Sequence, residues 1–348
     1  MPASLKRSPP KSSRPRSTGR VTLAEVAQHA GVSPITASRA LRADRNVAAE
    51  LVERVRAAAA ALAYVPDMAA RSLASSRSDN VVVLVPSLSN RVFTDLLEAA
   101  QAGLMASGYQ TLFGVTHYAA AEEERLLRSY LAHRPAGLLL TGTDHTPASR
   151  RMLRDSGVPH VHLMETMPAA KGYSVGFSQV DAGRAVTQHL VDRGRRHIAF
   201  IAAQLDPRVM QRAAGYRACL AKAGLQDDGF EMLDPRPSSI ALGGEMFMQL
   251  MQARPDVDAV FFCNDDLAQG ALFAALRHGV AVPGQVAIAG FNDLEGSDQL
   301  LPPLTSIRTP RAEIGTRGAE LLVALMNGHA PPRPCVDVGY ELMARGST

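Results

Sequence analysis

The sequence lacks the features of a secreted, disulfide-linked or membrane-spanning protein. Its three cysteines, Cys219, Cys263 and Cys335, are isolated and have neither disulfide nor metal-ligand spacing. No apolar run approaches the roughly 18 residues of a membrane span. The basic N-terminus is not followed by the apolar segment of a secretory signal. These absences predict a reduced, cytoplasmic, soluble protein with no membrane partner.

The motifs of common enzyme chemistry are absent too. The chain has no Walker A loop, no His-Glu-x-x-His zinc motif, no nucleophile elbow and no dinucleotide-binding glycine fingerprint. His160 and His162 share one face of an apolar run, where histidines are more often hydrogen-bonded than metal-ligating. Asp265 and Asp266 are adjacent, so they would point apart on a helix whose first turn favours acids. We predict no catalytic residue, no metal site and no cofactor.

Positive charge is concentrated at the N-terminal end. Residues 1–80 hold 13 Lys+Arg and 6 Asp+Glu, a net charge of +7, whereas the remainder has a net charge of −3. Residues 1–20 contain no acidic residue and are rich in proline and serine, which predicts a disordered basic tail. The distribution is typical of a polyanion-binding head on a nearly neutral body. A basic tail without a partner is the alternative.

Residues 21–64 have the pattern of three short helices. Thr22 begins a capping box, and Gly31 suits the left-handed turn that ends the first helix. Ser33-Pro34 is typical of the start of a second helix, and a third is expected over about 48–62. Two helices joined by a short turn containing glycine form a helix-turn-helix. Together with the basic charge, this predicts a head that binds double-stranded DNA.

Residues 80–348 predict an α/β body. Short β-branched runs alternate with amphipathic stretches, which indicates doubly wound parallel sheets with helices on both faces. About 270 residues exceed one ordinary sheet, so we expect two facing lobes with a ligand bound beyond the carboxyl ends of the strands. The expected strands are 81–85, 111–115, 137–141, 158–163, 198–202, 259–263 and 286–290. The expected helices are 94–107, 122–133, 181–193, 208–223 and 267–278.

The run from Val21 to Arg39 resembles the N-terminal signature of the LacI/GalR family of bacterial transcription regulators, the lactose and galactose repressors. Leu62-Ala63-Tyr64-Val65-Pro66 and the segment 69–73 after it are similar to the same family. The resemblance extends over roughly 21–348. It implies a small all-α helix-turn-helix head joined by a hinge helix to a two-lobed, periplasmic-binding-protein-like body.

The resemblance also implies domain boundaries. These are a tail at 1–20, a DNA-binding domain at 21–66, a hinge helix and linker at 67–79, and an effector-binding and dimerisation domain at 80–348. The first lobe would comprise about 80–178 and 309–332. The second lobe would comprise about 179–308 and 333–348.

In related repressors, the two residues after the Ser33 position and an arginine near the end of that helix face the base edges. Here they are Pro34, Ile35 and Arg39. Ile35 is expected to contact a thymine methyl group, with packing in the core as the alternative, and Arg39 to bind guanine or phosphate. The other expected DNA contacts are Thr22, Ser33, Thr36 and Ser38 in the head and Met68, Arg71 and Leu73 in the hinge, where Leu73 would wedge into the minor groove. Asp67 and Ala48 depart from the family pattern, which has Asn and a capping Ser there.

The resemblance places the effector in the body. Arg212 and Asn264 match positions that bind the effector in related regulators, and Asn292 replaces an acid that often holds sugar hydroxyls. The loss of that acid favours an anionic ligand, and a guanidinium such as that of Arg212 matches a carboxylate bidentately. A surface or ion-pair role for Arg212 is the alternative. The other expected effector contacts are Ser87, Ser89, Phe93 and His145.

The segments 85–90, 108–111, 176–177, 263–268 and 304–311 resemble the branch of the family that senses gluconate and 2-ketogluconate. The sequence therefore predicts a homodimeric repressor that a sugar acid of this kind releases from a palindromic operator. The alternatives are a neutral-sugar or purine effector, an activator, or a sugar-binding protein without a regulatory role.

Overall fold

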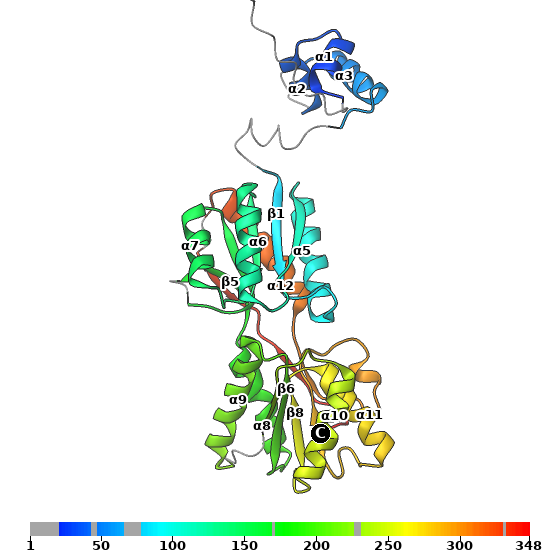
Figure 1. Ribbon diagram of the computed structural model, residues 1–348, viewed down its shortest axis with the longest axis vertical. Coiled ribbons are helices and arrows are strands. Elements are labelled where there is room, and N and C mark those ends of the chain that lie inside the picture. Colours follow the sequence, from blue (N-terminus) through cyan, green and yellow to red (C-terminus); the bar gives the residue numbers. More distant parts are fainter. Residues whose placement is uncertain (1–20, 43–46, 66–77, 169–170, 226–230, 330–331) are drawn as a thin grey trace, which may run out of the picture. The chain divides into compact units, whose positions relative to one another are not determined.

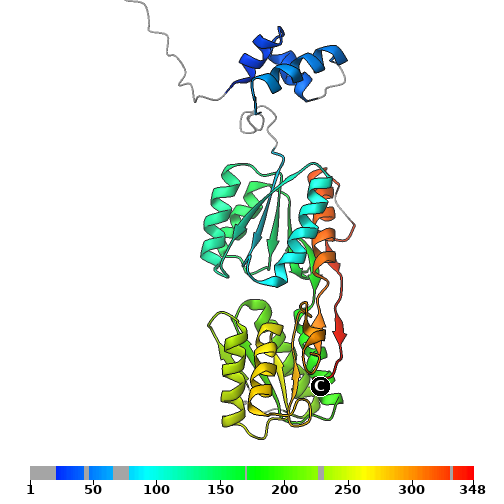
Figure 2. The same ribbon diagram turned by 90° about the vertical axis from the view of Figure 1, so that its right-hand side faces the viewer.

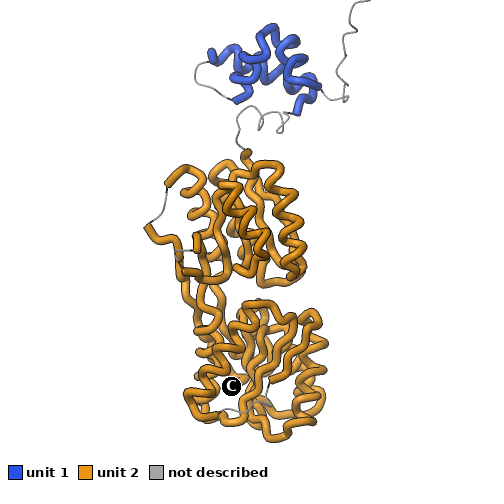
Figure 3. The backbone as a smooth tube through the Cα atoms, turned by 60° about the vertical axis from the view of Figure 1, so that its left-hand side comes forward, with its two compact units in different colours: residues 1–76 blue, residues 77–348 orange. Residues whose placement is uncertain are grey.

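The computed structural model describes residues 21–42, 47–65, 78–168, 171–225, 231–329 and 332–348 (Figure 1). The chain divides into two compact units, residues 1–76 and 77–348 (Figure 3). Each unit has its own buried core and is described by itself. The expected hinge contacts Met68, Arg71 and Leu73, together with Asp67, lie outside the described residues.

The described residues of the first unit form three helices, as expected. These are α1 (Leu23–His29), α2 (Pro34–Leu41) and α3 (Ala49–Ala61). Their core contains Val26 and Val55 among small alanines, which let the helices approach closely. Gly31, between α1 and α2, has a φ of +64°, which is the left-handed conformation the turn requires.

Side-chain caps fix where the first two helices begin. The backbone N–H of Thr22 donates to the Glu25 carboxylate at 2.6 Å, and the N–H of Glu25 donates back to the Thr22 hydroxyl at 3.4 Å, which completes the capping box. The hydroxyl of Ser33 accepts from the N–H of Thr36 at 3.1 Å, with Pro34 as the first residue of α2. Ala48, before α3, provides no side-chain cap.

The first lobe of the body is a parallel sheet with helices on both faces (Figures 1 and 2). The order of its described strands is β11-β5-β4-β3-β1-β2. The strands are β1 (Asn80–Val85), β2 (Gln110–Val115), β3 (Gly137–Thr141), β4 (His160–Glu165), β5 (Tyr173–Phe177) and β11 (Cys335–Asp337). The lobe also holds the 3-10 turn η1 (Arg91–Phe93) and the helices α5 (Thr94–Ala106), α6 (Ala120–Ala132), α7 (Pro147–Ser156) and α12 (Arg311–Met326).

The second lobe repeats this plan around a smaller parallel sheet, whose described strands have the order β7-β6-β8-β9. The strands are β6 (Ile198–Ala203), β7 (Glu231–Asp234), β8 (Ala259–Phe262) and β9 (Ala287–Ala289). The helices are α8 (Gln179–Asp192), α9 (Pro207–Ala223), α10 (Ile240–Ala253) and α11 (Asp265–His278), with the 3-10 turn η4 at Ser297–Gln299. The two sheets confirm the prediction that the body divides into two α/β lobes.

Two glycines let α8 and α9 pack backbone against backbone. A Cβ atom on Gly215 would lie 2.1 Å from the carbonyl oxygen of Val180, and one on Gly183 would lie 2.5 Å from that of Arg212. Both distances are far below van der Waals contact. Glycine at these two positions therefore sets the position of α9, which carries Arg212.

The C-terminal segment differs from our expectation. We expected residues 333–348 in the second lobe and the last strand at about 336–338. Instead, β11 pairs in parallel with β5, so it belongs to the first sheet, and a further strand, β12 (Glu341–Met343), pairs antiparallel with β10 (Ser306–Arg308). The reason is that the apolar residues after α12 complete the edge of the first sheet before the chain crosses to the second lobe.

None of the helices in the described ranges is long and apolar enough to cross a membrane.

Candidate nucleic-acid interface and ligand site

Helix α2 presents one exposed and one buried face. Ala37 and Ala40 are fully buried against the other helices of the head, whereas Pro34 and Arg39 are exposed. The side chain of Ile35 is 68% exposed, which rules out packing of this residue in the core of the head. A large apolar side chain beside an exposed arginine is suited to contact a thymine methyl group and a guanine or phosphate, respectively.

Three of the other residues expected to contact DNA, Thr22, Ser33 and Thr36, form hydrogen bonds through their hydroxyls at the starts of α1 and α2. The Thr22 hydroxyl donates to Glu25 at 3.0 Å, and the hydroxyls of Ser33 and Thr36 lie 2.9 Å apart. Ser38 is half-buried. The exposed positions are thus the N-cap residue Ser33 and, on α2 itself, Pro34, Ile35 and Arg39, while Thr36 and Ser38 are half-buried.

In the body, the loops that follow the strands of the first lobe contact the second lobe. Glu165, at the end of β4, accepts a hydrogen bond from Gln211 of α9 at 2.6 Å. Arg91 of η1 pairs with Glu295 at 2.9 Å. We call the region joined by these contacts the lobe junction. It lies where ligands bind in open α/β sheets, beyond the carboxyl ends of the strands.

Arg212 is held firmly at the lobe junction. It is 6% exposed, its Nε donates to Gln179 at 2.8 Å, and its Nη1 donates to the Cys263 carbonyl at 2.6 Å. The guanidinium stacks on the Phe291 ring, 3.8 Å from its centroid. Burial lowers the pKa of Arg212 to about 10, so the side chain stays charged at neutral pH. The protein occupies two of its five N–H donors, and the donors on Nη2 have no hydrogen-bond partner among the described residues.

Asn264 and Asn292 lie in loops of the second lobe that the fold holds in place. Asn264 caps α11 by accepting from the N–H of Leu267 at 3.1 Å and exchanges hydrogen bonds with Ser238. Asn292 is buried with a φ of +112°, and its Oδ1 has no hydrogen-bond partner among the described residues. A buried amide oxygen without a partner is costly, and the hydroxyl of a ligand could satisfy it.

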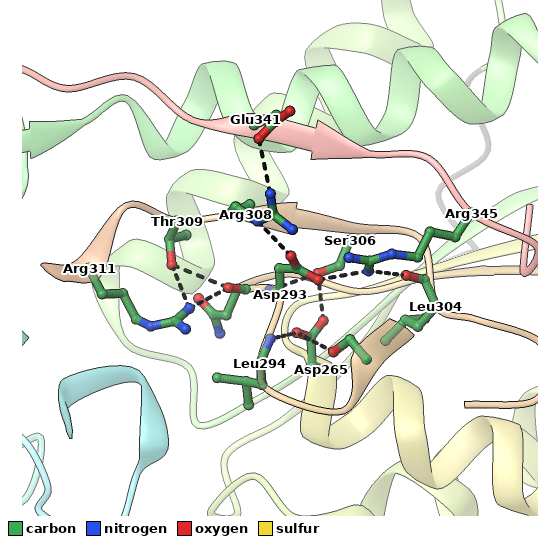
Figure 4. Close-up of polar contacts among 12 residues, drawn as sticks. Asp265, Asp293, Leu294, Leu304, Ser306, Arg308, Thr309, Arg311, Glu341 and Arg345 are labelled. Atoms are coloured by element: carbon green, nitrogen blue, oxygen red, sulfur yellow. Dashed lines mark hydrogen bonds and ion pairs between the residues drawn. The ribbon is translucent and has the colours of Figure 1, made fainter. Parts of the chain in front are cut away.

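A polar network surrounds the loop that contains Asn292 (Figure 4). Asp293 pairs with Arg308 at 2.9 Å and with Arg345 at 2.7 Å. Arg311 pairs with Asp95 of α5 at 2.9 Å and donates to the Asn292 carbonyl oxygen. The loop is therefore tied both to the crossing segments and to the first lobe.

The first-lobe residues that we expect to contact the effector differ in their exposure and in their hydrogen bonds within the protein. Ser87 is half-buried and Ser89 exposed; their hydroxyls lie 3.0 Å apart in the loop after β1. Phe93 is buried. His145 is bonded through both ring nitrogens, Nδ1 to Glu123 at 2.7 Å and Nε2 to His162 at 3.2 Å. Burial lowers the pKa of His162 to about 3, so that ring is neutral.

Two residues of the lobe junction were absent from the sequence prediction. Arg208 lies one helical turn before Arg212 on α9, and both are buried. Glu165 ends the apolar strand β4, and burial raises the pKa of its carboxyl group. The spacing of four residues between the arginines, and an acid at the end of an apolar run, were signals available in the sequence.

Comparisons with known proteins agree with this architecture. A family model described as bacterial regulatory proteins, lacI family, matches residues 22–67, and a periplasmic binding protein-like domain matches residues 187–348. The chain is 56% identical over 333 residues to the HTH-type transcriptional regulator GntR of Pseudomonas aeruginosa, covering 96% of this chain and 97% of the relative. The chain belongs to the lacI family of bacterial regulatory proteins. This lacI-family regulator is therefore a DNA-binding transcriptional regulator with a ligand-responsive body.

Solved structures of other family members are similar to this regulator over both units or over the body. The transcription regulator GntR from Chromobacterium violaceum matches with a TM-score of 0.75 at 48% identity, covering 77% of this chain and 98% of that chain. The lac repressor dimer bound to operator and the anti-inducer ONPF matches with a TM-score of 0.82 at 26% identity, covering 94% and 99%. Both of these GntR relatives are transcriptional regulators.

Proposed function

We propose that this lacI-family regulator is a dimeric repressor that binds a palindromic operator and is released by a sugar acid such as gluconate or 2-ketogluconate. The observation that carries the effector assignment is the buried, charged guanidinium of Arg212, which stacks on the Phe291 ring. Phe291 is followed by Asn292, whose amide oxygen has no hydrogen-bond partner in the described part of the chain. A cationic group beside neutral hydrogen-bonding groups suits a ligand with one carboxylate and several hydroxyls. We propose no chemical turnover of this ligand.

The head supplies the DNA contacts in this proposal. Ile35 and Arg39 would read base edges in the major groove, with Pro34 beside them, while Thr22, Ser33, Thr36 and Ser38 would contact phosphates. Met68, Arg71 and Leu73 would contact the minor groove, with Leu73 as an apolar wedge that bends the duplex. The similarity to a lac repressor dimer bound to operator supports both the dimer and the DNA site.

The body supplies the response to the effector. Ser87, Ser89, Phe93 and His145 of the first lobe and Arg212, Asn264 and Asn292 of the second would hold the ligand. A ligand that contacts both lobes favours one relative arrangement of them. To act as an inducer, it must favour the arrangement that does not bind DNA by about 1–3 kcal/mol.

A gel-shift titration tests this proposal. The full chain, mixed with operator DNA, should be released by gluconate or 2-ketogluconate at concentrations that leave a non-operator duplex unaffected. Glucose and purines serve as competing candidates in parallel titrations. If glucose or a purine releases the operator and no sugar acid does, the sugar-acid assignment is wrong and the regulator has another effector. If an added ligand tightens operator binding, the protein uses a corepressor.

A further inference from the structure

The two buried arginines of α9 differ in how many of their donors the protein uses. Arg212 donates from Nε and Nη1 to well-placed acceptors. Arg208 is 7% exposed, and the one side-chain hydrogen bond found for it among the described residues is a long one, from Nη2 to Asp206 at 3.5 Å. A guanidinium has five N–H donors, and burying them without acceptors is unfavourable. Arg208 is therefore the better-suited of the two arginines to bind both oxygens of an anion.

Glu165 approaches Arg208 from the other lobe. It is 3% exposed; its Oε1 accepts from Gln211, while its Oε2 has no hydrogen-bond partner among the described residues. A Cβ atom on Gly142 would lie 3.4 Å from Arg208 Nη1, 3.5 Å from Glu165 Oε2 and 3.0 Å from Oδ1 of the exposed Asp144. The two side chains thus converge on the same glycine, yet no ion pair joins them. A buried acceptor on Glu165 and donors of the nearly buried Arg208 therefore remain available at one place in the lobe junction.

The charges around this place permit an anionic ligand. Arg208 and Arg212 contribute two positive charges. Asp206 faces Arg208, but its Oδ1 accepts from the N–H groups of Arg208 and Val209 at the start of α9, which offsets its charge. Asp144 is exposed to solvent, and burial raises the pKa of the Glu165 carboxyl group while the positive charge of Arg208 opposes that rise. The aromatic ring of Phe93, whose centroid is 5.9 Å from Arg208 Cζ, closes another side.

We propose that Arg208 binds the carboxylate of the effector and that Glu165 Oε2 accepts a hydrogen bond from a hydroxyl of the same molecule. Together they select a polyhydroxy carboxylate over a neutral polyol of the same length. The ligand then contacts the second lobe through its carboxylate and the first lobe through its hydroxyl. This inference rests on the proposed function, and it assigns to Arg208 the carboxylate contact that the sequence suggested for Arg212.

Calorimetry on the full chain tests the role of Arg208. Gluconate and glucitol share their hydroxylated carbon chain, but glucitol has a hydroxymethyl group in place of the carboxylate. The wild type should bind gluconate at least about 100-fold more tightly than glucitol, as expected for a bidentate, charge-assisted contact. Arg208→Gln should remove most of this preference while the weak affinity for glucitol stays the same. Arg208→Lys, which keeps the charge without the fork, should retain part of the preference and guards against misfolding of the first variant.

Two further variants make the test specific. Arg217→Gln is the matched control, because Arg217 lies on the same helix but pairs with Glu231 at 2.6 Å, away from the lobe junction; it should bind both ligands as the wild type does. Glu165→Gln places a donor group on a residue that offers an acceptor. It should weaken gluconate and glucitol alike, by about tenfold, because both carry the hydroxyl.

The outcomes separate this inference from the proposed function. If gluconate releases the operator from the wild type and from Arg208→Gln at equal concentrations, Arg208 does not bind the carboxylate and the inference is wrong, while the proposed function stands. If gluconate binding depends on Arg208 but no sugar acid releases the operator, the proposed function is wrong and the site assignment stands. Tighter binding of glucitol or of a sugar phosphate than of gluconate to the wild type would overturn the carboxylate selectivity.

Discussion

Asp265 offers the sharpest test of the electrostatics within the second lobe. This first residue of α11 is 0% exposed, and its carboxylate accepts hydrogen bonds from the Ser306 hydroxyl at 2.7 Å, the Leu294 N–H at 2.7 Å and the Ser297 hydroxyl at 3.3 Å (Figure 4). Burial raises its pKa from the ordinary 3.8 to about 6, against the opposing effect of these donors. The substitution Asp265→Asn removes the titrating group from this network.

The sign of the pH dependence follows from the raised pKa. The folded chain binds a proton at Asp265 more tightly than the unfolded chain, so the stability that this carboxyl contributes is greatest below about pH 4 and falls as the pH rises to about 6. A difference of about 2 pKa units corresponds to about 3 kcal/mol. The Asn variant lacks this dependence. The free energy of unfolding of the wild type minus that of Asp265→Asn should therefore decrease by about 3 kcal/mol between pH 3 and pH 7.

Urea denaturation followed by far-ultraviolet circular dichroism measures both free energies across the pH range. The other carboxyl groups titrate in both proteins and cancel in the difference. Asp298→Asn, at an exposed aspartate in η4, controls for the loss of one negative charge. A difference that stays constant, or that grows with pH, would refute the reasoning. It would mean that the hydrogen-bond donors balance or outweigh the effect of burial on the pKa of Asp265.

Four further predictions concern the start of α3, the crossing of α8 and α9, the exposed face of α2 and the salt dependence of operator binding. Ala48→Ser should add the missing side-chain cap of α3 and raise the free energy of unfolding of the head by about 1 kcal/mol, measured by thermal denaturation; an unchanged midpoint would contradict it. Gly215→Ala should displace α9 and weaken effector binding by calorimetry while operator binding stays the same; normal effector affinity would show that the crossing tolerates a methyl group. Arg39→Ala should abolish the preference for operator over non-operator DNA in gel shifts, with effector affinity unchanged, and a retained preference would exclude a base contact by Arg39. Wild-type affinity for operator should fall with salt at a log–log slope of about −0.9 for each neutralised phosphate, and a flat dependence would argue against phosphate contacts.

Much of the secondary structure could be predicted because its signals are local. The capping box at Thr22, the Ser33-Pro34 helix start and the left-handed Gly31 each depend on residues within one helical turn, and the structure shows all three as expected. The alternation of β-branched runs with amphipathic stretches likewise predicted the parallel sheets, because a buried strand needs continuous apolar residues wherever it lies.

Side-chain environments were less accessible from the sequence. Periodicity left open whether Ile35 belonged to the core of the head, and the packing of α2 leaves it exposed instead. The role of β11 as an edge strand of the first sheet was missed, since three residues carry too little pattern to choose between two sheets. The exposure of Ile35 depends on which face of α2 the other helices cover, and the position of β11 depends on which sheet has a free edge beside it.

The class of this protein can be read from its residues alone, because a basic, capped helix-turn-helix is followed by an α/β body with the motifs of the lacI family. Which donors and acceptors remain available at the lobe junction depends on tertiary packing. Glu165 and Arg208 are far apart in the sequence and in different lobes, and the folding of both sheets brings them to Gly142. The donors that remain on Arg208, and those that Gln179 and Cys263 occupy on Arg212, follow from packing between segments that no local pattern relates.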